Sequence, residues 1–179
     1  MLLSATLATA CGSGGAPDGS ADGGANPNPS VVIAFASSFK GFRSWMAFDV
    51  TKEAAPGTVH PDAHLIEYLN KAPPTGSTSF PIGTILVKEP TVNGEPSTTP
   101  YFAMVKRGGG YNADGASDWE WFELQNIPGN NDDVQLVWRG VGPPAGEVYG
   151  GDPNAGCNTC HRDCGNDAVC AKSVSLAAF

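Results

Sequence analysis

The chain has 179 residues, enough for one domain with a proper core and too few for two. Its 23 glycines and 15 prolines argue against a helical bundle and favour short strands joined by turns. The formal net charge of −8, with ten Lys plus Arg and no basic cluster, excludes a nucleic-acid-binding function.

Residues 1–11 form an apolar segment that ends at Cys11. The segment is too short to span a bilayer and has the length of a signal-peptide core. Its end, Leu7-Ala8-Thr9-Ala10-Cys11, resembles the lipobox of bacterial lipoproteins, although Leu7 is one place further from the cysteine than usual. We therefore expect an exported protein on the periplasmic face of a membrane, anchored only through a lipidated Cys11. The alternative is a free or disulfide-bonded Cys11 in a disordered tail.

Residues 12–30 contain no large apolar side chain. Such a stretch cannot bury enough surface to offset the entropy of ordering, so we expect a disordered Gly/Ser/Pro linker. A flexible coil of this length spans roughly 25 Å, which would lift a domain clear of a membrane surface. The folded domain then covers residues 31–179.

The folded domain is predicted to be α+β, mainly an antiparallel β-sheet meander with flanking helices. Apolar residues at helical spacing predict a helix over 37–48, and a short helix is expected from about Asn166. Short apolar segments separated by turn residues predict strands over 63–70, 83–90, 100–108, 118–125 and 134–140. The connections are dense in Gly, Pro, Asn and Asp, as hairpin loops are.

The stretch "GCNTCHRDCGNDAVC", residues 156–170, holds four of the five cysteines and one of the three histidines. A zinc site would need two well-separated ligand pairs, whereas these ligands are crowded and the adjacent Cys160 and His161 diverge. A thioredoxin-like redox pair would begin a helix after a βαβ unit, whereas this pair follows a Gly/Pro-rich loop. Neither alternative suits the spacing well.

The spacing C-x-x-C-H favours covalent attachment of haem c. Cys157 and Cys160 would form thioethers with the two vinyl groups, and His161 would be the axial ligand of the iron. The remaining pair, Cys164 and Cys170, would form a disulfide in an oxidising compartment. The alternative for that pair is two unpaired buried cysteines.

The order of these pieces resembles the cytochrome P-460 and cytochrome c′-beta family of mono-haem c-type cytochromes. The resemblance covers most of residues 37–175 and rests on a few stretches, in chain order: "FRSWMAFDV", "HLIEYLN", "FPIGTILVKEP", "YFAMVKRGGGYNADGASDWEWFEL", "CNTCH" and "NDAV". It implies a dimeric, largely antiparallel β fold with flanking helices. It also implies that His161 is the proximal ligand and that the distal iron site is open to small nitrogen species. Cys164 and Cys170 depart from the type members.

Lys88 is the residue on which the resemblance bears most. Cytochromes P-460 carry a lysine, in a segment resembling "GTILVKE", that is cross-linked to a haem meso carbon, and Lys88 matches that position. Cytochromes c′-beta share the fold without the cross-link. From the residues alone, strand alternation puts Lys88 on the face of Leu86, and a lysine before Glu89 and Pro90 is typical of a solvated strand end at a sheet edge.

The resemblance implies oxidation of hydroxylamine at the haem, with electrons passed to a redox partner protein. A proton-accepting side chain would assist, and Glu120, Glu123 and Glu147 are candidates. The alternatives are a protein that binds nitric oxide without turnover and a simple electron carrier, if Met46 or Met104 bound the iron. Both methionines are instead expected in the core. His60 and His64 are expected at the surface or fixing a loop.

Overall fold

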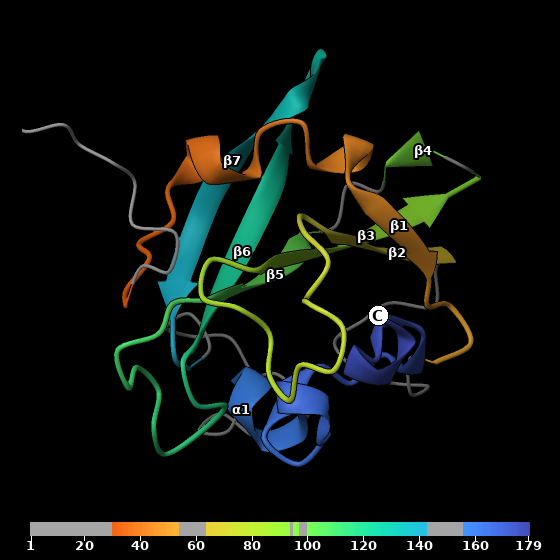
Figure 1. Cartoon of the computed structure of the whole chain (residues 1–179). Helices are drawn as coiled ribbons and strands as arrows, with labels where there is room; N and C mark the ends of the chain where they lie inside the picture. The colour runs from red at the N-terminus through yellow and green to blue at the C-terminus, as the bar shows by residue number, and fades with distance from the viewer. Residues whose placement is uncertain (1–29, 54–63, 94, 97–99, 143–155) are drawn as a thin grey trace, which may run out of the picture.

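The computed structural model of the chain describes residues 30–53, 64–93, 95–96, 100–142 and 156–179 (Figure 1). They form one seven-stranded antiparallel sheet in the order β1-β2-β3-β5-β6-β7, with the short β4 paired to β3. The strands are β1 (Met46–Asp49), β2 (His64–Leu69), β3 (Ile85–Val92), β4 (Glu95–Pro96), β5 (Tyr101–Lys106), β6 (Trp119–Ile127) and β7 (Asn130–Gly140). The predicted antiparallel meander is confirmed.

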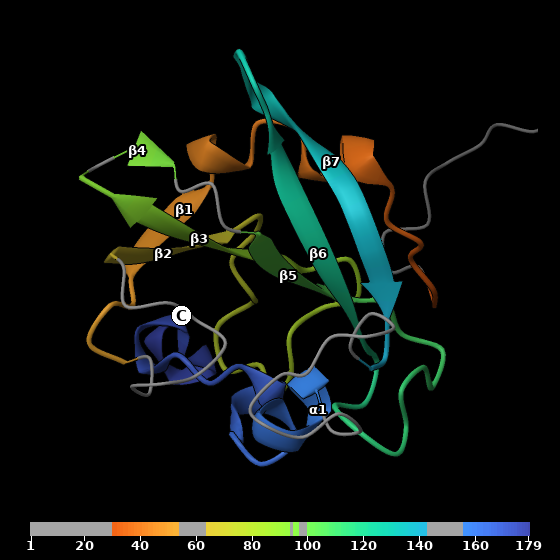
Figure 2. The ribbon, with the colours of Figure 1, turned by 180° about the vertical axis from the view of Figure 1, so that it is seen from behind.

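Each of the five predicted strands has a counterpart, namely β2, β3, β5, β6 and β7 in that order. β7 begins earlier than expected because a two-residue turn, Pro128-Gly129, joins it directly to β6. Gly129 has φ +77° there, a left-handed conformation that glycine adopts without strain. β6 and β7 form the long hairpin seen from behind in Figure 2.

The helix predicted over 37–48 is wrong. Two 3₁₀ turns, η1 (Ala36–Phe39) and η2 (Phe42–Ser44), replace its first part, and β1 replaces the rest. Gly41 separates the turns with a left-handed φ of +66°. Phe39 and Phe42 are both fully buried. Their i, i+3 spacing predicts an α-helix, but 3₁₀ geometry also places residues i and i+3 on one side.

The remaining helices are short and lie near the C-terminus (Figure 1). They are α1 (Gly156–His161), η3 (Asn166–Ala168), η4 (Lys172–Val174) and η5 (Leu176–Ala178). The short helix expected from Asn166 is thus a series of 3₁₀ turns, and α1 was not predicted. Within the described residues, no helix has the length and apolar character needed to cross a bilayer.

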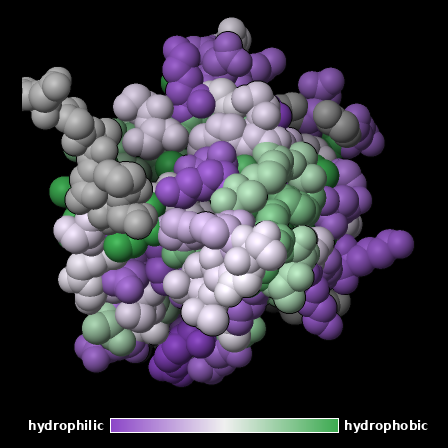
Figure 3. All heavy atoms as spheres, in the orientation of Figure 1, coloured by the Kyte–Doolittle hydropathy of each residue, from purple (hydrophilic) through white to green (hydrophobic). Residues whose placement is uncertain are grey.

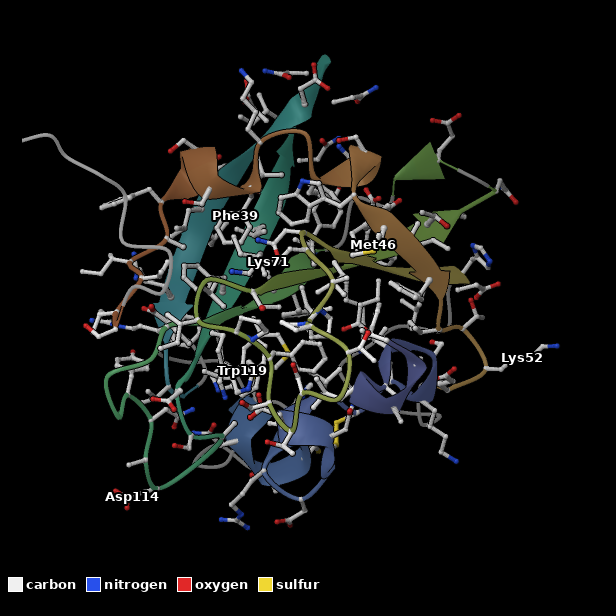
Figure 4. All side chains as sticks on the ribbon, in the orientation of Figure 1. Phe39, Met46, Lys52, Lys71, Asp114 and Trp119 are labelled. Atoms are coloured by element: carbon white, nitrogen blue, oxygen red, sulfur yellow. A yellow bond between two sulfur atoms is a disulfide. The ribbon has the colours of Figure 1, made fainter. Side chains whose placement is uncertain are left out.

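The two faces of the sheet carry separate cores. One core packs under η1 and η2 and includes Phe39, Phe42, Val87, Tyr101 and Phe122. The other packs against the C-terminal turns and includes Leu65, Leu69, Leu86, Met104, Trp119, Trp121, Val169 and Val174. In Figure 4 the labels of Phe39 and Trp119 mark these two cores. We call the second face the C-terminal face of the sheet.

The outer surface is largely hydrophilic in the view of Figure 3, with smaller hydrophobic patches.

Charged groups are also buried on the η1–η2 face of the sheet. Glu89 is 1% exposed and accepts from Arg43, with Nη2 2.6 Å from Oε1. Glu120 is 2% exposed and accepts from Arg139, with Nε 2.7 Å from Oε1. Each of these carboxylates is therefore neutralised by a guanidinium on that face.

Candidate functional site

Cys157 and Cys160 both lie on the single α-helical turn α1, at positions i and i+3. Residues at this spacing share one side of a helix, so the two thiols can serve one group. Cys157 packs against the core of the C-terminal face, and burial raises the pKa of its thiol to about 12. Cys160 is exposed, and neither cysteine is in a disulfide. Both are therefore thiols in the structure, and Cys157 is protonated at neutral pH.

His161 ends α1 and faces the sheet. Its Nδ1 lies 2.8 Å from the carbonyl oxygen of Ala168. A carbonyl accepts only, so Nδ1 carries the proton and Nε2 carries the lone pair when the ring is neutral. The ring packs on Trp121, with centroids 4.8 Å apart and planes inclined by 49°. Burial lowers the pKa of His161 to about 4, against the opposing effect of the Ala168 hydrogen bond.

The carbonyl of Ala168 is delivered by an unusual backbone turn. Asn166, Asp167 and Ala168 have φ values of +45°, +54° and +67°, three consecutive left-handed residues that are not glycine. Each such residue disfavours the fold by roughly 1–2 kcal/mol, so the surrounding contacts must hold the turn. A strained segment that is kept in place beside a histidine indicates a positioning role.

Asp167 supplies the contacts that tie this turn to the sheet and to Phe80. Its Oδ1 lies 2.6 Å from Nζ of Lys106 on β5, and its Oδ2 accepts the backbone N–H of Phe80 at 2.8 Å. Its carbonyl accepts the indole N–H of Trp119 at 2.8 Å. Lys106 is 5% exposed and also lies 5.1 Å above the Trp119 ring. This buried ion pair fixes the turn to the centre of the sheet.

Asn158, between the two cysteines, anchors α1. Its Oδ1 accepts from Nε1 of Trp121 at 2.9 Å and from Nδ2 of Asn112 at 2.8 Å. Its Nδ2 donates to the carbonyl of Val141 at 2.8 Å. A Cβ on Gly115 would lie 2.3 Å from the Asn158 side chain, so only glycine allows this approach. Trp121 thus touches both Asn158 and His161, which ties the helix to β6.

The structure joins Cys164 and Cys170 in a disulfide. The bond closes a loop around the left-handed turn. The Cys170 sulfur lies 3.5 Å from Nδ1 of His161. The disulfide is therefore part of the frame around the histidine.

Lys88 lies on β3 directly opposite Glu67 on β2 and Phe102 on β5. The predicted alternation with Leu86 is confirmed, because Leu86 belongs to the core of the C-terminal face. The edge position is wrong, since β3 has neighbours on both sides and Lys88 is only partly exposed. The charge of Lys88 also contributes to lowering the pKa of His161, after the larger effect of burial.

The predicted acids do not share one location. Glu120 lies on the opposite face of the sheet in its ion pairs with Arg139 and Arg107, which removes it as a candidate. Glu123 is 6% exposed and follows Trp121 by two on β6, which places it on the C-terminal face. Glu147 lies outside the described residues. Glu67 was not predicted as a site residue, although its alternation with Leu65 and Leu69 indicates that its side chain faces inward.

The other sequence predictions have mixed outcomes. Met104 is in the core, as predicted, with 4% of its surface exposed. Met46 was also predicted in the core, but it is 37% exposed and lies outside it. His64 is at the surface as expected and lies 3.1 Å from Asp49. His60 and Cys11 lie outside the described residues, as does the linker up to residue 29.

A c-type haem would suit the donors that meet at this site. Two unpaired thiols share one helix turn, and the adjacent histidine carries its lone pair on Nε2 because Nδ1 is bound to Ala168. An axial ligand must be a neutral imidazole, which is the form that burial of His161 favours. In the described part of the chain, no three His, Cys, Asp or Glu side chains gather as ligands of a metal ion.

The site is thus a histidine held by a strained turn, two thiols on the same helix α1, and Lys88 with Glu67 opposite it on the neighbouring strand. Compared with models of protein families, with curated proteins and with solved structures, the chain gives no significant match.

Proposed function

We propose that the chain is an exported c-type mono-haem protein that acts on small nitrogen compounds, with oxidation of hydroxylamine as its reaction. The observation that carries the proposal is the hydrogen bond between Nδ1 of His161 and the carbonyl of Ala168. It leaves Nε2 as the basic nitrogen of a histidine that directly follows two unpaired thiols, Cys157 and Cys160. These are the donors that one covalently attached haem requires.

In this proposal Cys157 and Cys160 hold the haem by thioethers, and His161 binds its iron through Nε2. A haem held there would supply one-electron redox chemistry, with a redox partner protein as the electron acceptor. The Ala168 hydrogen bond keeps His161 in one tautomer and orientation and raises its basicity as a ligand.

Lys88 and the residues around it distinguish hydroxylamine oxidation from gas binding. Lys88 lies on the C-terminal face of the sheet, where its charge interacts with His161. A lysine in that position can bond to the haem edge, which would alter the iron's electronic properties. The resemblance to cytochromes P-460 supports this bond and therefore favours hydroxylamine oxidation.

Apolar side chains on the β5 side of Lys88 favour a second candidate, nitric oxide binding without turnover. Phe102 lies opposite Lys88 on β5, and the buried Leu86 and Met104 lie on the same face. Apolar side chains of this kind would favour a small neutral gas over water. In this case Lys88 would remain unmodified.

The proposal is tested by expressing the full chain with a haem-maturation system. Denaturing electrophoresis with a peroxidase stain is expected to show haem on the band of the wild type and not on that of a Cys157→Ala/Cys160→Ala variant. Visible spectra of the ferric, ferrous and nitric-oxide-bound protein, together with assays of hydroxylamine oxidation, separate the two candidates. A wild-type band without haem contradicts both.

A further inference from the structure

The disulfide between Cys164 and Cys170 encloses the turn that positions His161. Its two cysteines are separated by 6 in the sequence, and the left-handed residues 166–168 lie between them. The backbone N–H of Cys164 donates to the carbonyl of His161 at 3.2 Å, and its sulfur lies 3.2 Å from the carbonyl oxygen of Cys160. The sulfur of Cys170 lies 3.5 Å from Nδ1 of His161. Both halves of the bond therefore contact the end of α1 that carries the histidine.

The disulfide and Asp167 attach the turn to different parts of the fold. Asp167 ties the turn to the sheet through Lys106 and Trp119. The disulfide ties it to the end of α1. The hydrogen bond between Nδ1 of His161 and the carbonyl of Ala168 spans these two parts. Its length and direction therefore depend on the disulfide as well as on Asp167.

The turn is a conformation that the backbone leaves when it is free to do so. Residues 166–168 have φ values between +45° and +67°, which side chains with a Cβ disfavour. A covalent bond across the loop removes many of the other conformations that the loop could adopt. When the bond is broken, the loop can relax, and the carbonyl of Ala168 then moves away from the imidazole ring.

The disulfide is also open to reductants. Cys170 is exposed and Cys164 is half-buried. Exposed disulfides exchange with thiols more readily than the buried structural ones. In the haem-loaded protein Cys157 and Cys160 would be thioethers, so neither could attack the disulfide from within the chain. An external dithiol is therefore the reductant that fits this bond.

We propose that the Cys164–Cys170 disulfide is a redox-sensitive positioning element for His161, which an external dithiol releases. The inference rests on the proposed function for its effect on the haem. In the step, one thiolate of the dithiol attacks the exposed sulfur of Cys170, and the bond to Cys164 breaks. The second thiolate of the dithiol then displaces Cys170. The dithiol is oxidised to a disulfide, and two electrons and two protons go to the cysteine pair.

Reduction of the disulfide changes the axial ligand in a defined direction. A histidine whose Nδ1 donates to a carbonyl is a more basic ligand than one without that hydrogen bond. A more basic ligand favours ferric over ferrous iron, so loss of the bond raises the reduction potential. Partners of this kind typically contribute about tenfold. We expect about a tenfold change in the ferric–ferrous equilibrium constant, which is about 59 mV for one electron.

The test uses the full haem-loaded chain, with dithiothreitol as the probe, added and then removed under argon. Spectroelectrochemical titration is expected to give a higher potential after this treatment. Resonance Raman spectra of the ferrous protein are expected to show the iron–histidine band at a lower frequency. The Cys164→Ala/Cys170→Ala variant should show both changes without dithiothreitol and should not respond to it.

Asn130→Ala is the matched control for lost stability. It removes hydrogen bonds in the turn between β6 and β7, at the end of this hairpin away from α1 (Figures 1 and 2). Its potential and its Raman band should respond to dithiothreitol as those of the wild type do. This separates an effect on the ligand from a general loosening of the fold.

The outcomes separate this inference from the proposed function. A potential and a Raman band that are the same with and without the disulfide would overturn the positioning role and leave the haem assignment standing. Absence of haem from the wild type would overturn the proposed function. Nitrogen-15 NMR of the haem-free chain would then decide the positioning role. The Nδ1–H signal of His161 should exchange slowly with water in the oxidised chain and rapidly after dithiothreitol, and an unchanged exchange rate would overturn the role.

Discussion

Nδ1 of His161 lies 2.8 Å from the carbonyl oxygen of Ala168, and Ala168 is the third of three consecutive left-handed residues. The hydrogen bond and the strained turn depend on each other. The turn brings the carbonyl to the ring, and the ion pair between Asp167 and Lys106 holds the turn to β5. The orientation of the histidine is therefore set from the centre of the sheet as well as from α1.

Breaking the Lys106–Asp167 pair should destabilise the protein and loosen His161. Lys106→Met leaves Asp167 buried and without its cation, which should lower the free energy of unfolding by about 3–5 kcal/mol. Chemical denaturation measures the loss. In haem-loaded protein the same variant should shift the reduction potential, because the hydrogen bond that tunes the axial ligand becomes less ordered.

The double variant Lys106→Met/Asp167→Asn separates the lost charge pair from general damage. It removes both charges, so it should recover part of the stability that Lys106→Met loses. Lys40→Met, which breaks the exposed pair with Asp133, is the control and should change stability by less than about 1 kcal/mol. Equal losses of unfolding free energy in Lys106→Met and Lys40→Met would contradict the role of the Lys106–Asp167 pair in holding the turn.

Replacing Asn158 should detach α1 from the sheet. Asn158→Ala removes hydrogen bonds to Trp121, Asn112 and Val141 and leaves buried donors unsatisfied, so a loss of about 2–4 kcal/mol in unfolding free energy is expected. Gly115→Ala should act in the same direction, since its Cβ would lie 2.3 Å from the Asn158 side chain. Asn131→Ala, at an exposed position, should have little effect. Wild-type stability in Asn158→Ala would contradict the anchoring role.

The strands were predictable because their apolar residues alternate or run continuously between turns. β6 is buried on both faces, with Trp121 on one and Phe122 on the other, and its aromatic residues favoured a strand although Glu120 and Glu123 interrupt the apolar pattern. The helix over 37–48 failed because the spacing of Phe39 and Phe42 suits two 3₁₀ turns as well as an α-helix. Gly41 was the available sign that the helix could not continue.

The site was only partly predictable. Cys157, Cys160 and His161 carry a local motif, so their proximity follows from the chain itself. Asn158, Lys106 and Asp167 carry none, because their roles depend on contacts between segments far apart in the sequence. The strand end before Pro90 suggested an edge for Lys88, since local composition does not say that β2 and β5 flank β3.

Protein prepared without haem should lose stability as the pH falls, because of His161. Its pKa is about 4 in the folded chain, below the ordinary value of 6.5, so the unfolded chain binds more protons between these values. The unfolding free energy should therefore be highest above pH 6.5 and fall by about 3 kcal/mol as the pH drops to 4. Denaturation at a series of pH values measures this.

The matched variant for the pH experiment is His161→Asn, which cannot titrate and should show a shallower fall over the same interval. His64→Asn is the control, because that histidine is exposed and should leave the steep fall in place. A wild type and a His161→Asn variant with parallel pH curves would contradict the assignment.

Removing the disulfide should lower stability modestly. The bond between Cys164 and Cys170 closes a sequence separation of 6, and loop-closure entropy for so short a loop is worth about 2 kcal/mol. The Cys164→Ala/Cys170→Ala variant should show that loss in chemical denaturation and should still acquire haem. In a non-reduced digest of the wild type, a thiol reagent that modifies both cysteines would contradict the bond.

Lys88 decides between turnover and gas binding. Because it lies half-buried on the C-terminal face and its charge reaches His161, we expect it to be bonded to the haem in the mature protein. Mass spectrometry of a tryptic digest should then recover little unmodified Lys88 peptide from the wild type. Lys88→Arg should retain haem through Cys157 and Cys160 but oxidise hydroxylamine at least ~10-fold more slowly, a change of about 1.4 kcal/mol in the activation free energy. Lys52→Arg, at an exposed position, is the control. Unmodified Lys88 in good yield would exclude the bond and favour nitric oxide binding, and unchanged oxidation in Lys88→Arg would separate the activity from the lysine.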